Sequence, residues 1–431
     1  KLGTFGGVFT PSLLTILGVI MYLRFGWVVG NVGLIGTLII VTLSTSITFL
    51  TSLSIASIAT DTQVKGGGAY YMISRSLGIE VGGAVGIPLF IAQALSVALY
   101  VIGFAESLVA VFPTLNMTLV GCGVTVAIGL LALFSTEATI RIQYFILAAI
   151  VISLLSLVFG SSLEDAPTEM IGTATDQPRE GFWIVFAVFF PAVTGIMAGV
   201  NLSGDLKDSA KSIPKGTFLA VGCGYLVYMV LPIILATRVD AATLIDDPLV
   251  MRRISLWGDA ILLGVWGVWG ATLSSAVGSI LGAPRILQAL AQDQVLPRSF
   301  HWLGKEHPAS GIPRAGTIFT MVLAIIAVIL GDLDMIAPIL SMFFLTTYGV
   351  LNVAAGTERL LGSPSFRPSF RTHWFFSLLG GGGCIAVMFL INPLATLIAI
   401  FLVGMTFVWL KRRGLRTTWG DVRRGMWLAL T

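Results

Sequence analysis

The sequence predicts an all-α polytopic membrane protein with twelve transmembrane helices, of which the first and sixth are discontinuous. Of its 431 residues, 56% are hydrophobic and only 11% are charged, which is too little charge to cover a soluble protein of this length. Apolar segments of about 20 residues recur along the chain, and each is long enough to cross a bilayer. Two of them, TILGVI at 15–20 and FFPAVTGIMAGVNLSGD at 189–205, contain glycines or a proline where a membrane helix should be continuous.

Each expected span is an apolar run of bilayer length, and the first is too long and too poor in flanking charge for a cleaved signal peptide. We expect the spans at 8–30, 33–59, 79–111, 116–134, 142–160, 182–202, 216–237, 257–283, 315–331, 335–357, 374–391 and 394–410. Two stretches between them, 65–78 and 282–297, have the pattern of short amphipathic helices under the bundle.

The distribution of Lys and Arg predicts the orientation. With the N-terminus in the cytoplasm, all but five of the 25 Lys and Arg residues fall on the cytoplasmic side, as the positive-inside rule requires. The cytoplasmic segments are then 60–78, 135–141, 203–215, 284–314, 358–373 and the tail after 410. The largest outer loop, 161–181, is acidic instead, so we expect both termini in the cytoplasm.

The positions of the two interrupted spans predict the domain organisation. Breaks in the first and sixth spans indicate two five-helix repeats of inverted topology, about 8–160 and 182–357, with a binding site between them at mid-membrane. The helices of 374–410 are then an accessory pair. Residues 1–410 form one transmembrane transport domain, and 411–431 form a basic cytoplasmic tail.

Composition excludes several function classes. The net charge of +4 reflects the inner-face bias and does not indicate a nucleic acid partner. Cys122, Cys223 and Cys384 lie in apolar spans, where structural disulfides and metal clusters are not expected. The sequence has no nucleophile elbow or phosphate loop, and the glycines of 66–68 follow no soluble strand. We expect neither an enzyme nor a cofactor.

The breaks themselves predict ion binding. Pro191 leaves the carbonyl of Ala187 without its helical donor, and Gly195 allows a sharp turn. A half-helix that ends at a break presents carbonyls to a cation, and one that begins there presents amides to an anion. The same applies at 15–20. A structural kink in a packed bundle is the alternative, because glycine and proline are frequent in membrane helices.

Titratable residues do not favour proton coupling. No acidic residue lies deep in a predicted span, and His301, His307 and His373 are all cytoplasmic, whereas proton-coupled carriers keep an intramembrane carboxylate or histidine. Neutral oxygen and amide ligands for small ions are favoured. An amino-acid zwitterion would also fit two broken helices.

At these residues the chain resembles the cation–chloride cotransporters, a branch of the amino acid–polyamine–organocation superfamily. The resemblance runs through 2–30, 67–78, 98–106, 189–206, 271–290 and 366–371. It implies a LeuT-like fold and an electroneutral symporter of the plasma membrane that moves chloride with Na+, K+ or both. It also implies a homodimer, for which the glycines of 380–383 are a candidate packing surface.

The resemblance implies ligands for each ion. For potassium they are Thr15, Ile16, Tyr100, Pro191 and Thr194. The family usually has asparagine where this chain has Thr15, which puts potassium affinity in question, while Tyr100 favours a potassium site over a mere packing role. For chloride they are the amides of Gly18, Val19 and Ile20, and those of Gly195, Ile196 and Met197 with the hydroxyl of Tyr348. A neighbouring carbonyl would also satisfy that phenol.

Members that use sodium have two adjacent serines in the eighth span, and Ser274 and Ser275 match them. The resemblance implies that they bind sodium with the carbonyls of Leu14, Leu17 and Ala271, although serines in membrane helices often bond to their own i−4 carbonyl. We expect a sodium–potassium–chloride symporter. The alternatives are a potassium–chloride or sodium–chloride symporter, an amino-acid permease of the same fold, and a channel or non-transporting subunit.

Two lone charges predict an outer gate. Arg24 and Glu106 lie at similar depth near the outer ends of the first and third spans, so we expect them to pair when the outer vestibule closes. Two separate side chains that reach the membrane interface independently are the alternative.

Overall fold

The computed structural model consists of helices, several of which begin at a side-chain cap. It describes residues 2–61, 64, 66–134, 136–163, 180–258, 267–307, 311–362 and 366–415. The side chains of Asp208, Asp240 and Asn392 accept hydrogen bonds from backbone amides in the first turns that follow them. The helices are η1 (Phe5–Phe9), α1 (Thr10–Ile16), α2 (Val19–Leu23), α3 (Phe25–Asp61), α4 (Gly68–Leu77), α5 (Ile79–Val111), α6 (Met117–Phe134), α7 (Thr136–Val158), α8 (Phe182–Phe189), η2 (Phe190–Val193), α9 (Ile196–Asn201), η3 (Ser203–Asp205), α10 (Ser209–Arg238), α11 (Ala241–Asp246), α12 (Val250–Ile254), α14 (Val268–Gln292), η4 (Arg298–Gly304), α15 (Arg314–Leu330), α16 (Leu333–Leu360), α17 (Trp374–Ile391) and α18 (Pro393–Arg413).

The described residues include eight helical stretches that are long and apolar enough to cross a membrane, together with three shorter apolar helices. The eight are Phe5–Leu23, Phe25–Asp61, Ile79–Val111, Phe182–Asp205, Ser209–Arg238, Leu333–Leu360, Trp374–Ile391 and Pro393–Arg413, and the shorter ones are Met117–Leu133, Ile142–Val158 and Arg314–Leu330. The prediction of an all-α, polytopic chain is confirmed. The exact count of twelve spans stays a prediction.

One of these stretches is two helices joined at a bend. Gly33 interrupts α3 with φ +69° and ψ −179°, a conformation that a side chain would strain. The bend falls between the first and second predicted spans, 8–30 and 33–59. The predicted tail from 416 onward, residues 164–179 of the outer loop and residues 259–266 of the eighth span lie outside the described residues.

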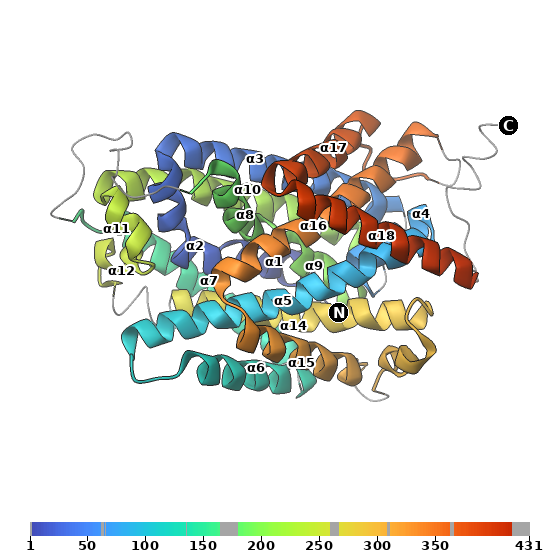
Figure 1. Cartoon of the computed structure of the whole chain (residues 1–431), viewed down its shortest axis with the longest axis horizontal. Helices are drawn as coiled ribbons and strands as arrows, with labels where there is room; N and C mark the ends of the chain where they lie inside the picture. Colours follow the sequence, from blue (N-terminus) through green and yellow to red (C-terminus); the bar gives the residue numbers. More distant parts are fainter. Residues whose placement is uncertain are drawn as a thin grey trace.

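The interrupted helices lie at the centre of the bundle. The most apolar window of Phe5–Leu23 is 94% buried and that of Phe182–Asp205 is 89% buried, against 11% for Pro393–Arg413. α1 contacts α9, α10 and α14, and α5, α10 and α16 surround this centre in Figure 1. Helices α17 and α18 lie at the periphery. The irregular backbone is therefore shielded from lipid, where unpaired backbone groups are not tolerated.

The structure corrects one predicted element. Residues 282–297 do not form a separate amphipathic helix, because α14 continues from Val268 to Gln292. Pro284 lies inside it and removes one amide donor, but Ile286, Leu287 and Leu290 beyond it are buried against the bundle, and this burial keeps the helix continuous. By contrast, α4 forms within 65–78 as predicted.

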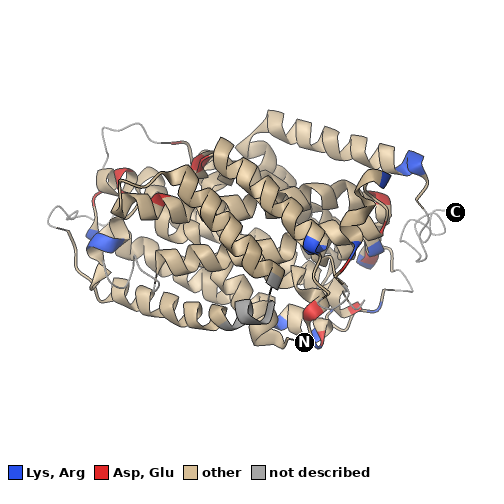
Figure 2. Cartoon of the chain, turned by 90° about the horizontal axis from the view of Figure 1, so that it is seen from below, with Lys and Arg blue, Asp and Glu red and all other residues tan. Residues whose placement is uncertain are grey.

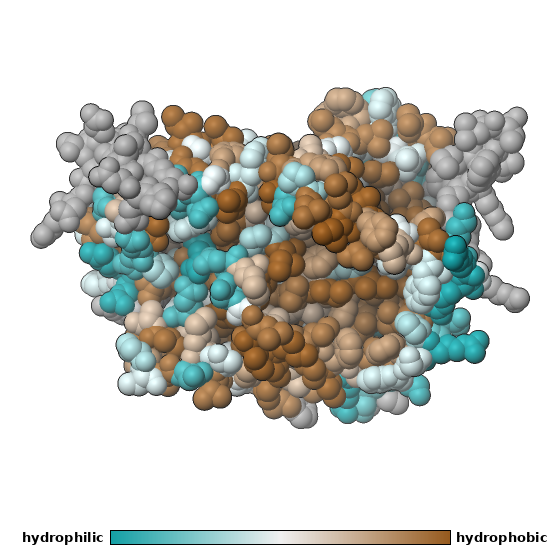
Figure 3. Space-filling model, viewed as in Figure 1, coloured by the Kyte–Doolittle hydropathy of each residue, from teal (hydrophilic) through white to brown (hydrophobic). Residues whose placement is uncertain are grey.

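The surface has the pattern of a membrane protein. Figure 2 shows the charged residues gathered toward the two ends of the bundle, with uncharged residues between them. The space-filling view has a broad hydrophobic region across its middle and hydrophilic side chains toward the edges (Figure 3). Apolar side chains on α18, such as Leu394, Ile400 and Phe401, are more than half exposed. The helices therefore run between two polar faces.

One end of the bundle gathers segments that the sequence assigns to the cytoplasmic side. Leu2 pairs with Asp205 and Lys207 through backbone hydrogen bonds of 2.8 and 2.9 Å. Arg75 of α4 forms an ion pair of 2.6 Å with Asp293 at the end of α14. Burial and the nearby Asp293 carboxylate raise the pKa of Tyr70, which also donates to that carboxylate. These segments share one face of the protein, as the predicted topology requires.

Candidate functional site

The first break lies between α1 and α2, at Leu17 and Gly18. The Leu17 amide still donates to the Leu13 carbonyl over 2.8 Å, but the ψ of Leu17 is +40°, which ends the helix. Gly18 follows with φ −98° and ψ −145°, and α2 begins at Val19. The last carbonyls of α1 and the first amides of α2 therefore have no helical partners inside an apolar bundle.

The second break lies between α8 and α9. Phe190–Val193 tighten into a 3₁₀ turn, and α9 begins after Gly195. Pro191 has no amide to donate to the Ala187 carbonyl, and the Ser341 hydroxyl of α16 donates to it instead over 2.6 Å. The Thr194 hydroxyl donates to the Pro191 carbonyl over 2.7 Å. One hydroxyl of α16 and one of the break itself thus satisfy carbonyls that the break frees.

The two breaks are in direct contact. A Cβ on Gly195 would lie 2.7 Å from the Ile16 nitrogen and 2.8 Å from the Ser12 carbonyl oxygen. Atoms do not approach a Cβ this closely, so only glycine allows α9 to begin against the end of α1. The free carbonyls and amides of both breaks consequently share one small, buried region.

Three of the predicted sodium ligands, Leu14, Ala271 and Ser275, meet between α14 and the first break. The Ser275 hydroxyl lies 3.2 Å from the Leu14 carbonyl oxygen and 2.9 Å from that of Ala271. A Cβ on Gly18 would lie 2.9 Å from the same hydroxyl. The Ser274 hydroxyl donates to the Ala271 carbonyl over 3.0 Å, within its own helix. Ser275 therefore links the two elements, whereas Ser274 does not.

Two of the predicted potassium ligands, Thr15 and Ile16, are the last residues of α1. The Thr15 hydroxyl donates to the Pro11 carbonyl of its own helix over 2.8 Å, and the Ile16 carbonyl accepts from the Tyr228 hydroxyl of α10 over 2.6 Å. Tyr100 of α5 is 4% exposed. A phenol in an apolar environment needs a hydrogen-bond partner or a ligand.

The predicted chloride donors are buried at the two helix starts, but part of the second set is already engaged. The Tyr348 hydroxyl donates to the Thr194 carbonyl over 3.1 Å, so a neighbouring carbonyl satisfies this phenol. The Met197 amide reaches the same carbonyl at 3.2 Å. The amides of Gly195 and Ile196 complete this second set of donors, and the amides of 18–20 form the first set. An anion bound at the second set would compete with the Thr194 carbonyl for the Tyr348 hydroxyl and the Met197 amide.

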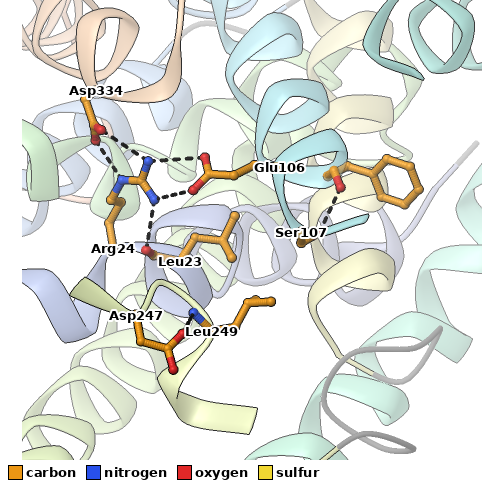
Figure 4. Close-up of polar contacts among 8 residues, drawn as sticks. Leu23, Arg24, Glu106, Ser107, Asp247, Leu249 and Asp334 are labelled. Atoms are coloured by element: carbon orange, nitrogen blue, oxygen red, sulfur yellow. Dashed lines mark hydrogen bonds and ion pairs between the residues drawn. The ribbon is translucent and has the colours of Figure 1, made fainter. Parts of the chain in front are cut away.

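The two predicted gate residues lie in contact, and a third joins them. The Arg24 guanidinium donates to Glu106 of α5 over 2.9 and 3.2 Å and to Asp334 of α16 over 2.6 and 3.2 Å. Figure 4 shows the guanidinium between the two carboxylates. Arg24 is only 9% exposed, at the junction of α2 and α3. The network ties the end of α2 to α5 and α16.

Sequence reasoning missed Tyr228, Ser341 and Asp334. The first two are polar residues inside predicted spans, which is the same signal that marks Tyr100 and Tyr348. Asp334 directly precedes the predicted span 335–357, where it resembles an ordinary loop residue. Only the packing of α16 against α5 brings it to the guanidinium.

Comparison with known proteins places this site in a family. The model of the amino acid permease family matches residues 7–423. Solute carrier family 12 member 2 of Mus musculus is 33% identical over 98% of this chain and 40% of its own length. Cation-chloride cotransporter 1 of Arabidopsis thaliana is 33% identical over 98% of this chain and 48% of its own length. Solute carrier family 12 member 1 of Homo sapiens is 32% identical over 98% of this chain and 44% of its own length.

The chain thus spans less than half the length of these relatives. Their names are those of solute carriers and cotransporters, so the expected resemblance is confirmed. The match covers both breaks, the α14 serines and the three-residue charge network. The chain belongs to the amino acid permease family and is similar to its cation–chloride cotransporters along almost its whole length.

Proposed function

We propose that the chain is an electroneutral symporter that binds Na+, K+ and two Cl− between the breaks and moves them by alternating access. The observation that carries the proposal is the contact of Ser275 with the Leu14 carbonyl, 3.2 Å apart across two elements. It brings a hard hydroxyl oxygen to the free carbonyls of the first break. Oxygen ligands of this kind suit a small, hard cation.

One residue, Tyr100, supports the potassium assignment, and another, Thr15, weighs against it. Tyr100 is buried in the bundle, and the lone pairs of its phenol oxygen suit a cation ligand. The Thr15 hydroxyl, however, is engaged with the Pro11 carbonyl, and a threonine is shorter than the asparagine of the family. A lone pair of the hydroxyl oxygen remains available to a cation while its proton is donated. A sodium–chloride symporter is the alternative that this observation favours.

The chloride assignment depends on amides at the starts of α2 and α9. Helix starts favour anions because their first amides are unpaired and the dipole is positive there. A cation at the adjacent carbonyls would strengthen anion binding by Coulomb attraction at low effective dielectric. Each ion then raises the affinity for the other, so the empty and fully loaded carriers are the forms that reorient.

The proposed architecture has twelve spans in two inverted repeats, about 8–160 and 182–357, within a transport domain of 1–410. The central burial of both interrupted helices supports this arrangement, as does the peripheral accessory pair of 374–410. The basic tail of 411–431 and both termini are proposed to be cytoplasmic, and the protein to reside in the plasma membrane. A homodimer is proposed from the family resemblance.

The four glycines of 380–383, the candidate dimer contact, divide into two pairs. A Cβ on Gly380 would lie 2.9 Å from the Asn352 side chain, and one on Gly381 would lie 3.1 Å from Val353, so both pack on α16 of the same chain. Gly382 and Gly383 have nothing within 4 Å. Only the second pair is open to a partner subunit.

Ion-dependent uptake tests the proposal. Purified protein in proteoliposomes at zero membrane voltage should take up rubidium, a potassium tracer, only when sodium and chloride are both present. Uptake that needs chloride but not sodium would identify a potassium–chloride symporter. Labelled sodium uptake without rubidium uptake would identify a sodium–chloride symporter. A channel would give currents, and an amino-acid permease would be stabilised against heat by its amino acid.

A further inference from the structure

A deep apolar groove runs along the side of the bundle between α5, α15 and α16. It has a volume of about 590 Å³, and every residue that lines it is apolar. Phe90 of α5, Leu287 of α14 and Ile336 of α16 belong to its floor and are at most 4% exposed. Leu330 of α15 belongs to its rim and is 74% exposed. The groove is therefore an open indentation of the outer wall that reaches inward as far as α14.

The groove lies on a surface that faces the bilayer. Both α5 and α16 are long and apolar enough to cross a membrane, and α15 is one of the shorter apolar helices. In Figure 1, α5 and α15 lie side by side in the lower half of the view, and Figure 3 shows hydrophobic side chains over that region. An unfilled indentation would forfeit dispersion contacts along its walls. Lipid tails, which are as apolar as leucine, are the groups available there to fill it.

The length of the groove matches one lipid chain. Along α15 its lining extends from Phe319 to Gly331. These twelve residues correspond to about 18 Å at the helical rise of about 1.5 Å per residue. One leaflet contributes half of the hydrocarbon core of about 30 Å, so an extended acyl chain of that leaflet has a similar length. The volume is also within the range of about 300–1,000 Å³ that is typical of ligand pockets.

One end of the groove is basic. Pro297 and Phe300 of η4 line it there, and the exposed Arg298 lies between them in the chain. The Phe300 ring lies 6.4 Å from that of Phe319, so η4 packs against the beginning of α15. The exposed Arg314 is the first residue of α15. Two guanidinium groups are therefore carried by the two segments that meet at this end.

The opposite end is acidic. Gly331 and Met335 line the groove there, and Asp332 and Asp334 lie between them in the chain. Carboxylates repel a phosphate group, whereas arginine binds one through two parallel hydrogen bonds. The distribution of charge thus favours a phosphate at the η4 end of the groove and disfavours one at the other end.

We propose that the groove binds an anionic phospholipid, with one acyl chain along α15 and its phosphate at Arg298 and Arg314. Its position in the cytoplasmic leaflet, where anionic lipids are concentrated, rests on the proposed topology, in which 284–314 is cytoplasmic. Binding itself does not depend on which ions the chain moves. Because Leu287 of the floor belongs to α14, the bound chain supports the helix that carries Ser275.

Stabilisation by added lipid tests the headgroup contacts. Thermal melting of the purified protein in detergent is followed as phosphatidylglycerol or phosphatidylcholine with the same acyl chains is added. Wild-type protein should be half-maximally stabilised at a lower concentration of phosphatidylglycerol. The double variant Arg298→Gln/Arg314→Gln should raise that concentration about 30-fold, since each basic residue near anionic lipid contributes about fivefold. Lys411→Gln/Arg412→Gln is the matched control, because it removes two exposed charges at the end of α18, and it should behave as wild type.

Replacement of Ala327 tests the groove. Ala327 of α15 lines it, and the indole of Ala327→Trp would occupy the space of the acyl chain. This variant should weaken stabilisation by both lipids. Ala399→Trp is its control, because Ala399 is a partly exposed residue of α18 outside the groove, and it should keep the wild-type response. Glycerol phosphate, which carries the charge without an acyl chain, should stabilise none of these proteins.

Several results would overturn the inference. They are equal stabilisation of the wild-type protein by the two lipids, equal losses in the two double variants, a wild-type response of Ala327→Trp, and stabilisation by glycerol phosphate as strong as that by phosphatidylglycerol. A changed oligomeric state of Ala327→Trp in light scattering would identify a subunit contact instead. If Ala327→Trp does not fold, the comparison of the two double variants still decides. The assay involves no ion uptake, so a failure of the proposed function is distinguishable from a failure of the lipid site.

Discussion

Replacement of Ser275 by alanine tests the central site at its best-defined contact. The Ser275 side chain is fully buried, and its hydroxyl lies within reach of two carbonyls, those of Leu14 and Ala271. A hydroxyl has one proton, so it donates to one carbonyl at a time and keeps lone pairs for a cation. Alanine removes that oxygen and leaves the volume of the site almost unchanged. The variant therefore isolates one ligand.

The structure gives the size of the expected effect. A hydrogen bond or ligand contact to a charged group contributes about 1.5–3 kcal/mol, which corresponds to about a 10- to 150-fold change in an equilibrium constant. Ser275→Ala should therefore raise the half-saturating sodium concentration for rubidium uptake by about that factor. Ser274→Ala should have a smaller effect, because the Ser274 hydroxyl reaches only the Ala271 carbonyl of its own helix.

Sodium titration of rubidium uptake in proteoliposomes measures both variants. Thr272→Val is the control, since Thr272 is fully buried on the same helix and its hydroxyl bonds only to carbonyls of the preceding turn. The control should keep the wild-type sodium dependence. If Ser275→Ala also keeps it, the serine contact with Leu14 is structural and the sodium assignment is wrong. If Thr272→Val shifts as much as Ser275→Ala, loss of any hydroxyl on α14 accounts for the effect.

Three further predictions concern the breaks and the charge network. Glu106→Gln should impair uptake more than Asp334→Asn. The Glu106 side chain is 24% exposed and that of Asp334 is 65% exposed, so solvent screens the ion pair of Arg24 with Asp334 more strongly. Initial uptake rates of the two variants measure the difference. Gly195→Ala should destabilise the protein by about 1–3 kcal/mol, since its Cβ would meet the backbone of α1, and a melting temperature equal to wild type would contradict the contact. Tyr228→Phe should lower the free energy of unfolding by about 1 kcal/mol, because it loses the hydrogen bond to the Ile16 carbonyl. Thermal melting measures this loss. Tyr225→Phe, which removes a hydroxyl from an exposed contact, should not show it.

The sequence was sufficient to predict where the chain breaks, because local chemistry decides this. Pro191 cannot donate to Ala187 in any fold, and glycine at 18 and 195 permits what other residues do not. Both breaks lie within the predicted ranges, 15–20 and 189–205. The prediction of a separate amphipathic helix at 282–297 was wrong for the converse reason. Pro284 and its neighbours have the local signature of a helix end, and tertiary burial of the following turns outweighs it.

The partners of the freed groups could not be predicted from local chemistry. That Ser341 donates to Ala187, and that Tyr228 donates to Ile16, depends on how α16 and α10 pack against the breaks. The same limit applies to Asp334, which is remote in sequence from Arg24. A single sequence indicates which backbone groups need a partner, but the register between helices determines which side chain provides it.

The division between satisfied and unsatisfied groups is itself informative about function. In this structure the carbonyls of Ala187, Pro191 and Ile16 have hydrogen-bond donors, which hold the breaks in place. The side-chain amide of Asn201 has none among the described residues, although it is fully buried. Groups of the first kind stabilise the irregular backbone against the cost of leaving it unpaired in an apolar bundle. Groups of the second kind stay unpaired in the described part of the chain, so folding alone does not supply their interactions.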